Sequence, residues 1–337
     1  MIRRIVCFVL FALLLTFSGC NPISTQPEQT PEHILRLSAN VTEDSPAAEG
    51  INLFVQFVEE RSGGRISIEP YYDNVLGEES SVLEQLRYGG IDIGLISHIE
   101  LAELYEELLV FSLPYLFDSK EQYFRMLDNG LLADVYSELE EDSLKALAWY
   151  DMGSMIFCSD KWSLNKPDNY FQLTVGVTGG STVLDAVTKF GANVLALKES
   201  SLGVAFNQHL ISVGEETLLT YVQQHHFENA PYLLVDYHAF NSALMLIGMQ
   251  VTERLPAQDI EMIRDCACDA ALYGREHMEQ TENHAIELLH SEDCIITVAT
   301  KKERAIFRET LIPVYTKYTL VYRSLYDKIV AMQHLKR

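Results

Sequence analysis

The sequence predicts an α/β protein with two lobes, a cleft between them and long helices toward its C-terminal end. One observation is the succession strand, helix, strand, helix, strand over residues 34–96, which implies a parallel sheet with right-handed crossovers. Another is a second unit of the same kind that starts near residue 172. The third is the length of 337 residues, which ordinarily divides into two domains. Because ligands of open α/β sheets bind outside the carboxyl ends of the strands, this pattern indicates a binding protein without saying what is bound.

The first unit begins with a strand at residues 34–39, and the loop after it supplies Ser45 and Pro46 to start a helix. That helix carries apolar residues at helical spacing and ends at Gly63-Gly64. The remaining expected elements are an alternating strand at 65–69, a helix that holds Val82, Leu83 and Leu86, and a more buried strand at 91–96.

The second unit opens with an expected strand at residues 173–177, and the loop Thr178-Gly179-Gly180-Ser181 leads from it into a helix. Further strands are expected at 194–197 and 210–212, a helix near 200–208, a returning strand at 243–247, and helices over roughly 257–290 and 303–335. The expected division is lobe 1 at 33–150 with a return segment near 235–257, lobe 2 at 151–234, and a helical segment at 258–337 that packs on both lobes.

The first twenty residues differ from the rest of the chain. Arg3 and Arg4 precede an apolar run of about thirteen residues, which is too short for a membrane span and is typical of a signal peptide. The run ends in Ser18-Gly19-Cys20, which resembles a bacterial lipobox in which Cys20 is diacylated and becomes the mature N-terminus. The alternative is an ordinary signal peptide with a chance cysteine. Residues 21–32, rich in Pro and Thr, are expected to form a tether.

The composition excludes several classes of protein. Apolar residues make up 48% of the chain, which excludes a largely disordered protein. The 25 Lys+Arg against 48 Asp+Glu give a formal charge of −23, which argues against nucleic acid as a partner and against adhesion to anionic lipid by charge alone. Removal of residues 1–20 leaves 23 basic residues against 48 acidic ones, a formal charge of −25.

Several segments carry a resemblance to a known family. Residues 57–66 read FVEERSGGRI, residues 76–79 read LGEE, residues 84–93 read EQLRYGGIDI, and residues 110–117 read VFSLPYLF. Together with Leu147-Ala148-Trp149, Gly153 and the late segment 313–318, these resemble motifs of the solute-binding proteins of TRAP (tripartite ATP-independent periplasmic) transporters. The motifs keep their order and spacing over residues 34–318.

The resemblance implies a periplasmic-binding-protein-like fold of two α/β lobes bridged by a long helix. It implies an extracytoplasmic protein that closes on a small solute and delivers it to integral membrane permease subunits. Closure of this kind is a two-state hinge motion, and only a ligand that contacts both lobes favours the closed state. The alternative function is an interaction or sensory protein that kept the fold and lost solute transport.

Two departures concern the ligand. The resemblance implies an Arg in the strand at 173–177, because the planar guanidinium pairs with a carboxylate through two hydrogen bonds. Here Gly176 stands at that position, and Met155 stands where a second Arg is common. A carboxylate buried without a partner costs several kcal/mol, so the usual anchored pose is not expected.

Three explanations remain open. The ligand is neutral or cationic; or an anion binds the backbone amides of Thr178-Gly179-Gly180-Ser181 with help from His209; or solute binding has been lost. The candidate ligand-binding residues are Trp149, Asp151, Ser154, Met155, Gly176, Thr178, Ser181, His209, Glu215 and Tyr237. We expect Trp149, Asp151, His209 and Tyr237 to line a closed cleft, with Asp151 just after a strand end, although such aromatic residues are more often core and such an acid more often a solvated loop residue.

Other chemistry has little support in the sequence. His225, His226 and His238 lack companions at metal-ligand spacing, and Gly179-Gly180 lacks the Lys of a phosphate-binding loop. We therefore expect no metal, no cofactor and no catalytic residue. Of the body cysteines Cys158, Cys266, Cys268 and Cys294, at most one of Cys266 and Cys268 could pair with Cys294, and the alternative is that all four are free thiols.

Overall fold

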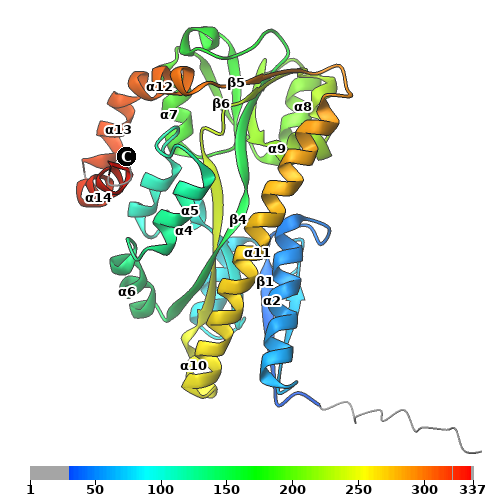
Figure 1. Ribbon diagram of the computed structural model, residues 1–337, viewed down its shortest axis with the longest axis vertical. Helices are drawn as coiled ribbons and strands as arrows, with labels where there is room; N and C mark the ends of the chain where they lie inside the picture. The colour runs from blue at the N-terminus through cyan, green and yellow to red at the C-terminus, as the bar shows by residue number, and fades with distance from the viewer. Residues whose placement is uncertain (1–29, 321, 335–337) are drawn as a thin grey trace, which may run out of the picture.

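The computed structural model describes residues 30–320 and 322–334 (Figure 1). The expected signal peptide, the acylated Cys20 and most of the expected tether lie outside these residues. The described chain forms a sheet of ten strands with helices on both faces, as expected for an α/β protein. The strand order is β2-β1-β3-β9-β4-β7-β5-β6, and β8 pairs with both β4 and β10.

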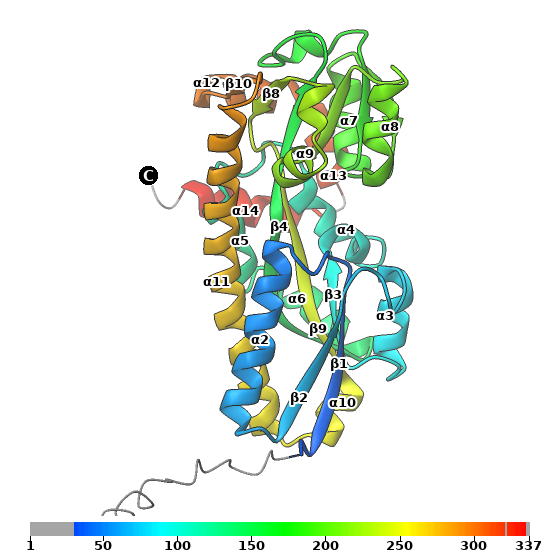
Figure 2. The same ribbon diagram turned by 90° about the vertical axis from the view of Figure 1, so that its right-hand side faces the viewer.

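Lobe 1 is built on the first half of this sheet. Parallel strands β1 and β3 lie side by side, β2 lies at the edge, and β9 pairs antiparallel with β3 (Figure 2). The bounds are β1 His33–Ala39, β2 Ile66–Tyr71, β3 Ile93–Ser97, β9 Phe240–Gly248, α2 Pro46–Ser62, α3 Glu79–Arg87, α4 His98–Leu101, α5 Lys120–Asp128, α6 Ala133–Glu141 and α10 Met249–Arg254, with a 3-10 helix at Glu106–Ser112. The expected return strand at 243–247 is therefore present as part of β9.

The start of α2 shows how the local sequence sets a boundary in this lobe. The Ser45 side chain accepts a hydrogen bond from the Ala48 amide at 3.2 Å, and Pro46 occupies the first helical position, where no amide hydrogen is needed. Gly63 ends the helix in the left-handed conformation, with φ of 65°.

Lobe 2 is built on the second half of the sheet. Parallel strands β6, β5 and β7 follow one another, and β7 pairs antiparallel with the end of β4. The bounds are β5 Thr174–Val177, β6 Asn193–Ala196, β7 Val213–Thr217, β8 Tyr232–Val235, β10 Ile295–Val298, α7 Ser181–Lys189, α8 Leu202–Asn207 and α9 Leu218–Gln223, with 3-10 turns at Pro167–Tyr170, Glu199–Ser201 and His226–Glu228.

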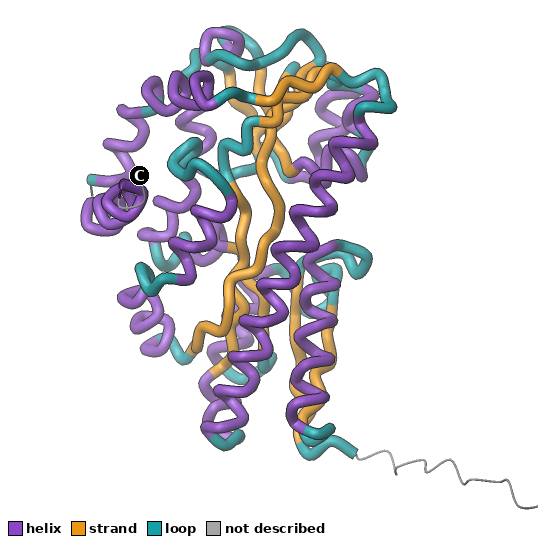
Figure 3. The backbone as a smooth tube through the Cα atoms, viewed as in Figure 1, coloured by secondary structure: helices purple, strands orange, loops and turns teal. Residues whose placement is uncertain are grey.

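One strand and one helix join the lobes. Strand β4, Leu144–Ser159, pairs with β9 along its first part and with β7 and β8 at its end (Figure 3). The 33-residue helix α11, Ala257–Leu289, contacts α2 in lobe 1 and α9 in lobe 2. At 1.5 Å per residue such a helix is about 50 Å long, enough to span both lobes.

The C-terminal segment differs from the single helical stretch expected at 303–335. It forms three helices, α12 Lys301–Thr310, α13 Ile312–Thr319 and α14 Arg323–His334. Pro313 lies at the start of α13, where its ring is tolerated, whereas it would disrupt the interior of a continuous helix. The three helices lie on the side of the molecule opposite α2 (Figure 1).

Other expectations were wrong in detail. The strand expected at 210–212 begins three residues later, at Val213, because β7 carries two fully buried carboxylates that an apolar pattern does not reveal. Asp151 lies within β4 and not after a strand end. The four cysteines of the described chain, Cys158, Cys266, Cys268 and Cys294, are free.

A buried charge cluster holds the junction of the lobes. The Lys120 ammonium on α5 lies 2.8 Å from Asp151 on β4 and 2.9 Å from Glu282 on α11. Glu282 also accepts hydrogen bonds from the Ser154 amide at 2.7 Å and the Ser154 hydroxyl at 3.1 Å. Burial raises the pKa of Asp151 against the opposing effect of Lys120. Burial alone would lower the pKa of Lys120, but the two carboxylates outweigh it and raise that pKa.

Replacement of Lys120 tests this cluster. Lys120→Met leaves two buried carboxylates without a cation, which we expect to lower the free energy of unfolding by about 3–5 kcal/mol. Lys145→Met is the control, because Lys145 makes only a long, exposed contact of 4.0 Å with Glu261 and should change stability by less than about 1 kcal/mol. Urea unfolding measures both, and equal midpoints for the two variants would contradict a structural role for Lys120.

Candidate functional site

A cleft lies between the two lobes and encloses a cavity of about 760 Å³. Lobe 1 contributes residues that lie at or just after the carboxyl ends of β1 and β3, and lobe 2 contributes residues of α8 and α9. Asn241 and Ser242 of β9 also line the cavity. Its hydrogen-bonding side chains are mostly neutral: Asn40, Thr42, Ser45, Ser97, Ser200, Asn207, Thr217, Thr220, Gln223, Gln224, Asn229, Asn241 and Ser242. Among the residues that the structure describes, no Lys or Arg lines this cavity. The wall therefore offers many hydrogen bonds and no positive partner for an acid.

The titratable groups of the cleft are one Glu and two His. Glu199 accepts a hydrogen bond from the Thr220 hydroxyl, so its carboxylate stays at the wall. His98 is buried at the base, with Nδ1 3.1 Å from the Ser242 carbonyl oxygen and Nε2 2.9 Å from the Ser112 hydroxyl. Burial lowers the pKa of His98 to about 4, so it is neutral at physiological pH.

His226 is held by a buried carboxylate behind the wall. Its Nδ1 lies 3.0 and 2.8 Å from the two oxygens of Glu216. Burial raises the pKa of Glu216, while His226 opposes that shift. The Cys158 thiol contacts the same carboxylate at 3.5 Å, and burial raises its pKa well above the usual value. A thiol held protonated in this way is a poor nucleophile, so the cluster is not a catalytic Cys-His pair.

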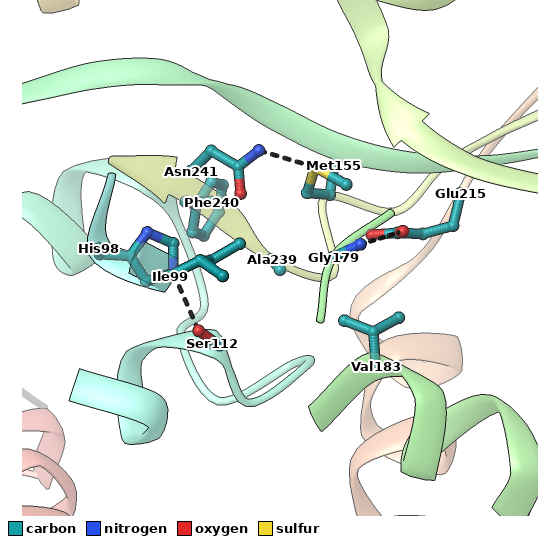
Figure 4. Close-up of a pocket in the computed structure, with 10 residues that line it drawn as sticks. All are labelled: His98, Ile99, Ser112, Met155, Gly179, Val183, Glu215, Ala239, Phe240 and Asn241. Atoms are coloured by element: carbon teal, nitrogen blue, oxygen red, sulfur yellow. Dashed lines mark hydrogen bonds between the residues drawn. The ribbon is translucent and has the colours of Figure 1, made fainter. Parts of the chain in front are cut away.

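A second, much smaller cavity of about 10 Å³ adjoins the cleft and shares His98, Ile99 and Asn241 with it (Figure 4). Ser112 belongs to lobe 1, whereas Gly179, Val183 and Glu215 belong to lobe 2. The remaining wall is Met155, Ala239 and Phe240, from β4 and the segment entering β9. A space of this size holds one water-sized group.

Glu215 occupies the loop that the sequence offers to an external anion. Its Oε2 accepts hydrogen bonds from the amides of Thr178 at 2.8 Å and Gly179 at 2.9 Å, and from the Thr178 hydroxyl at 3.2 Å. Two of the proposed anion-binding amides are therefore already bonded within the protein. His209, the proposed helper, is exposed after α8. These contacts argue against an anion bound through the amides of Thr178 and Gly179.

A buried histidine stands behind Glu215. His238 Nδ1 lies 3.0 Å from Asp236 Oδ1, and Nε2 lies 3.5 Å from Glu215 Oε1. The imidazole stacks on Phe157 with ring centroids 4.2 Å apart. Burial alone would lower the pKa of His238, but Asp236 and Glu215 outweigh it and raise that pKa to about 9.

The sequence-predicted site residues divide into three groups. Met155 and Glu215 line the small cavity, and Thr178 bonds to Glu215 beside it. Asp151 and Ser154 belong to the buried cluster around Lys120. The others lie away from both cavities: Trp149 is core and donates to Tyr136 at 2.8 Å, Tyr237 is half-buried beside Arg304, Ser181 is exposed at the start of α7, His209 is exposed, and Gly176 is buried in β5. Trp149, Asp151, His209 and Tyr237 thus do not share a cleft.

Gly176 has a packing role in this chain. A Cβ at this position would lie 2.9 Å from Leu197 and 3.0 Å from both Ile211 and Leu202. These aliphatic side chains fill the space beside β5, so there is no room for an Arg without repacking. The loss of the expected cation is thus accompanied by apolar packing at the same place.

Sequence reasoning missed the residues that line the main cleft. Asn40 follows β1, His98 follows β3, and Thr217 is the last residue of β7. All three lie at carboxyl ends of strands, which is where ligands of open α/β sheets bind. That rule, applied to each strand in turn, was the signal that could have found them.

The two lobes, the strand that they share and the cleft between them define a solute-binding protein. The model of the family "Bacterial extracellular solute-binding protein, family 7" matches residues 37–320, and this chain belongs to that family. Proteins of this family bind a small solute outside the cytoplasm and deliver it to a TRAP-type membrane permease. They serve transport and are not a family of enzymes.

Individual relatives are distant. The C4-dicarboxylate-binding protein DctB of Bacillus subtilis is 21% identical over 89% of this chain and 86% of its own length. The TRAP solute-binding protein of Ochrobactrum anthropi has a similar fold, with a TM-score of 0.85, 19% identity and coverage of 90% of this chain and 97% of that one. That of Chromohalobacter salexigens, with bound D-glucuronate, has a TM-score of 0.80 at 21% identity and coverage of 89% and 99%.

Two further properties of the described residues concern groups that could bind a metal ion and helices that could span a membrane. Within residues 30–320 and 322–334, no group of three or more His, Cys, Asp or Glu side chains is placed to hold a metal ion. No helix in the same part of the chain has the length and hydrophobicity needed to cross a membrane.

The raised pKa of His238 predicts how stability depends on pH. The folded-state value of about 9 lies above the usual 6.5, so the stabilisation is complete below about pH 6.5 and is lost as the pH rises through 9. We expect the wild type to lose about 3 kcal/mol of unfolding free energy from this group over that interval. His238→Gln should remove this part of the pH dependence, whereas His284→Gln, at an exposed position, should leave it unchanged. Urea unfolding at several pH values measures the slopes, and parallel profiles for wild type and His238→Gln would contradict the assignment.

Proposed function

We propose that this protein captures a small polar solute that carries no carboxylate. The observation that supports this most directly is the wall of the 760 Å³ cleft, where hydroxyl and amide side chains are numerous and no described Lys or Arg is present. A carboxylate transferred from water into such a site loses its hydration and gains no positive partner, which costs several kcal/mol. A neutral solute exchanges water for the neutral donors and acceptors of the wall at little cost.

Two further observations support the same proposal. Gly176 stands at the position of the expected Arg and lies against Leu197, Leu202 and Ile211. The amides of Thr178 and Gly179 already bind Glu215. The position of the expected Arg and two of the four amides of the loop are therefore already occupied by the protein itself.

The size of the cleft favours retained binding over a scaffold that has lost its ligand. Small-molecule sites typically measure about 300–1,000 Å³, and the cleft falls within that range. Both lobes contribute hydrogen-bonding residues to it, such as Asn40 in lobe 1 and Asn207 in lobe 2. A solute that bonds to both favours the closed form, the form that a permease would recognise.

Sugar acids and a dicarboxylate test the absence of acid binding. We expect D-glucuronate, D-galacturonate and succinate at about 5 mM to shift the melting temperature by less than about 1 °C, because only ligands with a Kd well below their concentration stabilise measurably. The control is the Chromohalobacter salexigens protein, which was crystallised with D-glucuronate and should be stabilised by it. A shift of several degrees in the present protein with any of these acids would overturn the proposal.

We also propose that the protein is held on the outer side of a membrane by acylation of Cys20. The segment Ser18-Gly19-Cys20 follows a short apolar run, and the polar residues 21–32 are long enough to space the lobes from the lipid. Two or three acyl chains anchor a protein stably, whereas one chain gives only weak, reversible binding.

Substitution of the cysteine tests the anchor. Cys20→Ser should move the protein from the detergent phase to the aqueous phase in a Triton X-114 partition, because no acyl chain can be attached. Cys7→Ser is the matched control, since Cys7 lies inside the same apolar run and should not affect partition. If the wild type is found in the aqueous phase, or if Cys20→Ser stays in the detergent phase, the anchor is absent from this position.

A further inference from the structure

One carboxylate oxygen of Glu215, Oε1, takes part in none of the hydrogen bonds described above. The side chain is fully buried, and Oε2 accepts all of its strong hydrogen bonds. Oε1 has no hydrogen-bond partner among the described residues, and neither has the facing Nε2 of His238, which lies 3.5 Å away. A buried acceptor without a donor costs about 1–3 kcal/mol, and more when it is charged, so this atom is suited to receive a donor from outside the protein.

The small cavity is the place where such a donor could lie. Glu215 lines it, together with His98 and Ser112 from lobe 1 and Gly179 from lobe 2 (Figure 4). Its volume of about 10 Å³ matches one hydroxyl or one amine nitrogen. The cavity adjoins the main cleft through His98 and Asn241, which line both.

Gly179 leaves space beside this carboxylate. A Cβ at position 179 would lie 2.6 Å from Glu215 Oε1, closer than real side chains approach, so any larger residue would displace the oxygen. The glycine therefore serves two purposes: its amide holds Oε2, and the absence of a side chain leaves room next to Oε1.

The charges around the cavity favour a donor over an acceptor. Asp236 and Glu215 share one imidazole, His238, so the group is net negative even when that imidazole is protonated. Arg304 lies nearby, but its guanidinium bonds to the backbone carbonyls of Asp236 and Tyr237. No described Lys or Arg lines the small cavity. An anion would be repelled there, whereas a hydroxyl or an ammonium group would gain a charge-assisted hydrogen bond.

We propose that Glu215 is the recognition residue for a hydrogen-bond donor of the solute, a hydroxyl or a protonated amine, which enters the small cavity from the cleft and bonds to Oε1. The inference rests on the proposed function and makes its ligand class narrower: a polyhydroxylated or amine-bearing solute. Because the donor lies between His98 of lobe 1 and Glu215 of lobe 2, the same bond also favours closure of the lobes.

Equilibrium dialysis of the purified full-length protein against a small-metabolite extract of its own bacterium, read by mass spectrometry, tests the inference. Wild type, Glu215→Gln, Gly179→Ala and Glu287→Gln are compared. Glu287→Gln is the matched control, because Glu287 is exposed on α11 and lines neither cavity. We expect wild type and Glu287→Gln to retain the same non-acidic solute, and both Glu215→Gln and Gly179→Ala to bind it at least about tenfold more weakly.

The retained compound then gives a second measurement on wild type alone, which stands even if a variant fails to fold. Methylation of its donor hydroxyl or amine should weaken binding at least about tenfold, because a site built to accept a hydrogen bond rejects an analogue that lacks the donor. Undiminished binding of every methylated analogue would overturn the role of Glu215.

The outcomes separate this inference from the proposed function. A retained non-acidic solute that binds equally to wild type and Glu215→Gln overturns the role of Glu215 and leaves the proposed function intact. A retained carboxylic acid overturns the proposed function, and if its binding is also unaffected by Glu215→Gln, it overturns both. Retention of no compound overturns both.

Discussion

The pairing of β4 with β9 is the constraint on which the rest of the molecule depends. Because β4 also pairs with β7 and β8 at its far end, one strand belongs to both lobes, and neither lobe can shift without bending it. The register of the pair is interrupted between Asp151 and Ser154, where Gly153 has φ of 101°. Lys120 bonds to Asp151 and, through Glu282, to the long helix at this same interruption. This irregular, charged segment of β4 also contributes Met152 to the wall of the cleft.

The distribution of charge divides the interior into a structural part and a binding part. Buried carboxylates are numerous, but each of Asp151, Glu216 and Asp236 has a cationic or imidazole partner within 3.0 Å. The cleft itself contains no described Lys or Arg, and its one carboxylate, Glu199, is held at the wall by Thr220. A formal charge of −23 and a cleft without Lys or Arg attract anions neither over distance nor on contact, so the proposed selectivity against acids has two independent physical sources.

The sequence was sufficient for most of the fold because its signals were local. Ser45, Pro46 and Gly63 mark the ends of α2, and alternating or continuous apolar runs mark β1, β2, β3 and β5. The sequence was insufficient for strands whose position depends on contacts with residues far away in the chain. The 16-residue β4 reads ALAWYDMGSM in its middle, and the run is broken by an acid and a glycine whose burial depends on Lys120 and Glu282, far away in the chain. The position of β7 was missed for the same reason, since Glu215 and Glu216 are buried only because Gly179 and His226 meet them.

The candidate site was also only partly predictable from the sequence, because its key contacts join residues that are far apart in the chain. Resemblance predicts an Arg at the position of Gly176, but it could not show that Leu197, Leu202 and Ile211 fill the space beside this glycine. Nor could it show that Glu215 takes the amides of the neighbouring loop. These two facts belong together: without a cation on β5, the buried Glu215 on the adjacent β7 is stabilised by the loop amides and shares the imidazole of His238 with Asp236. With Gly at position 176, the charged side chain that lines the small cavity beside the cleft is a carboxylate, Glu215.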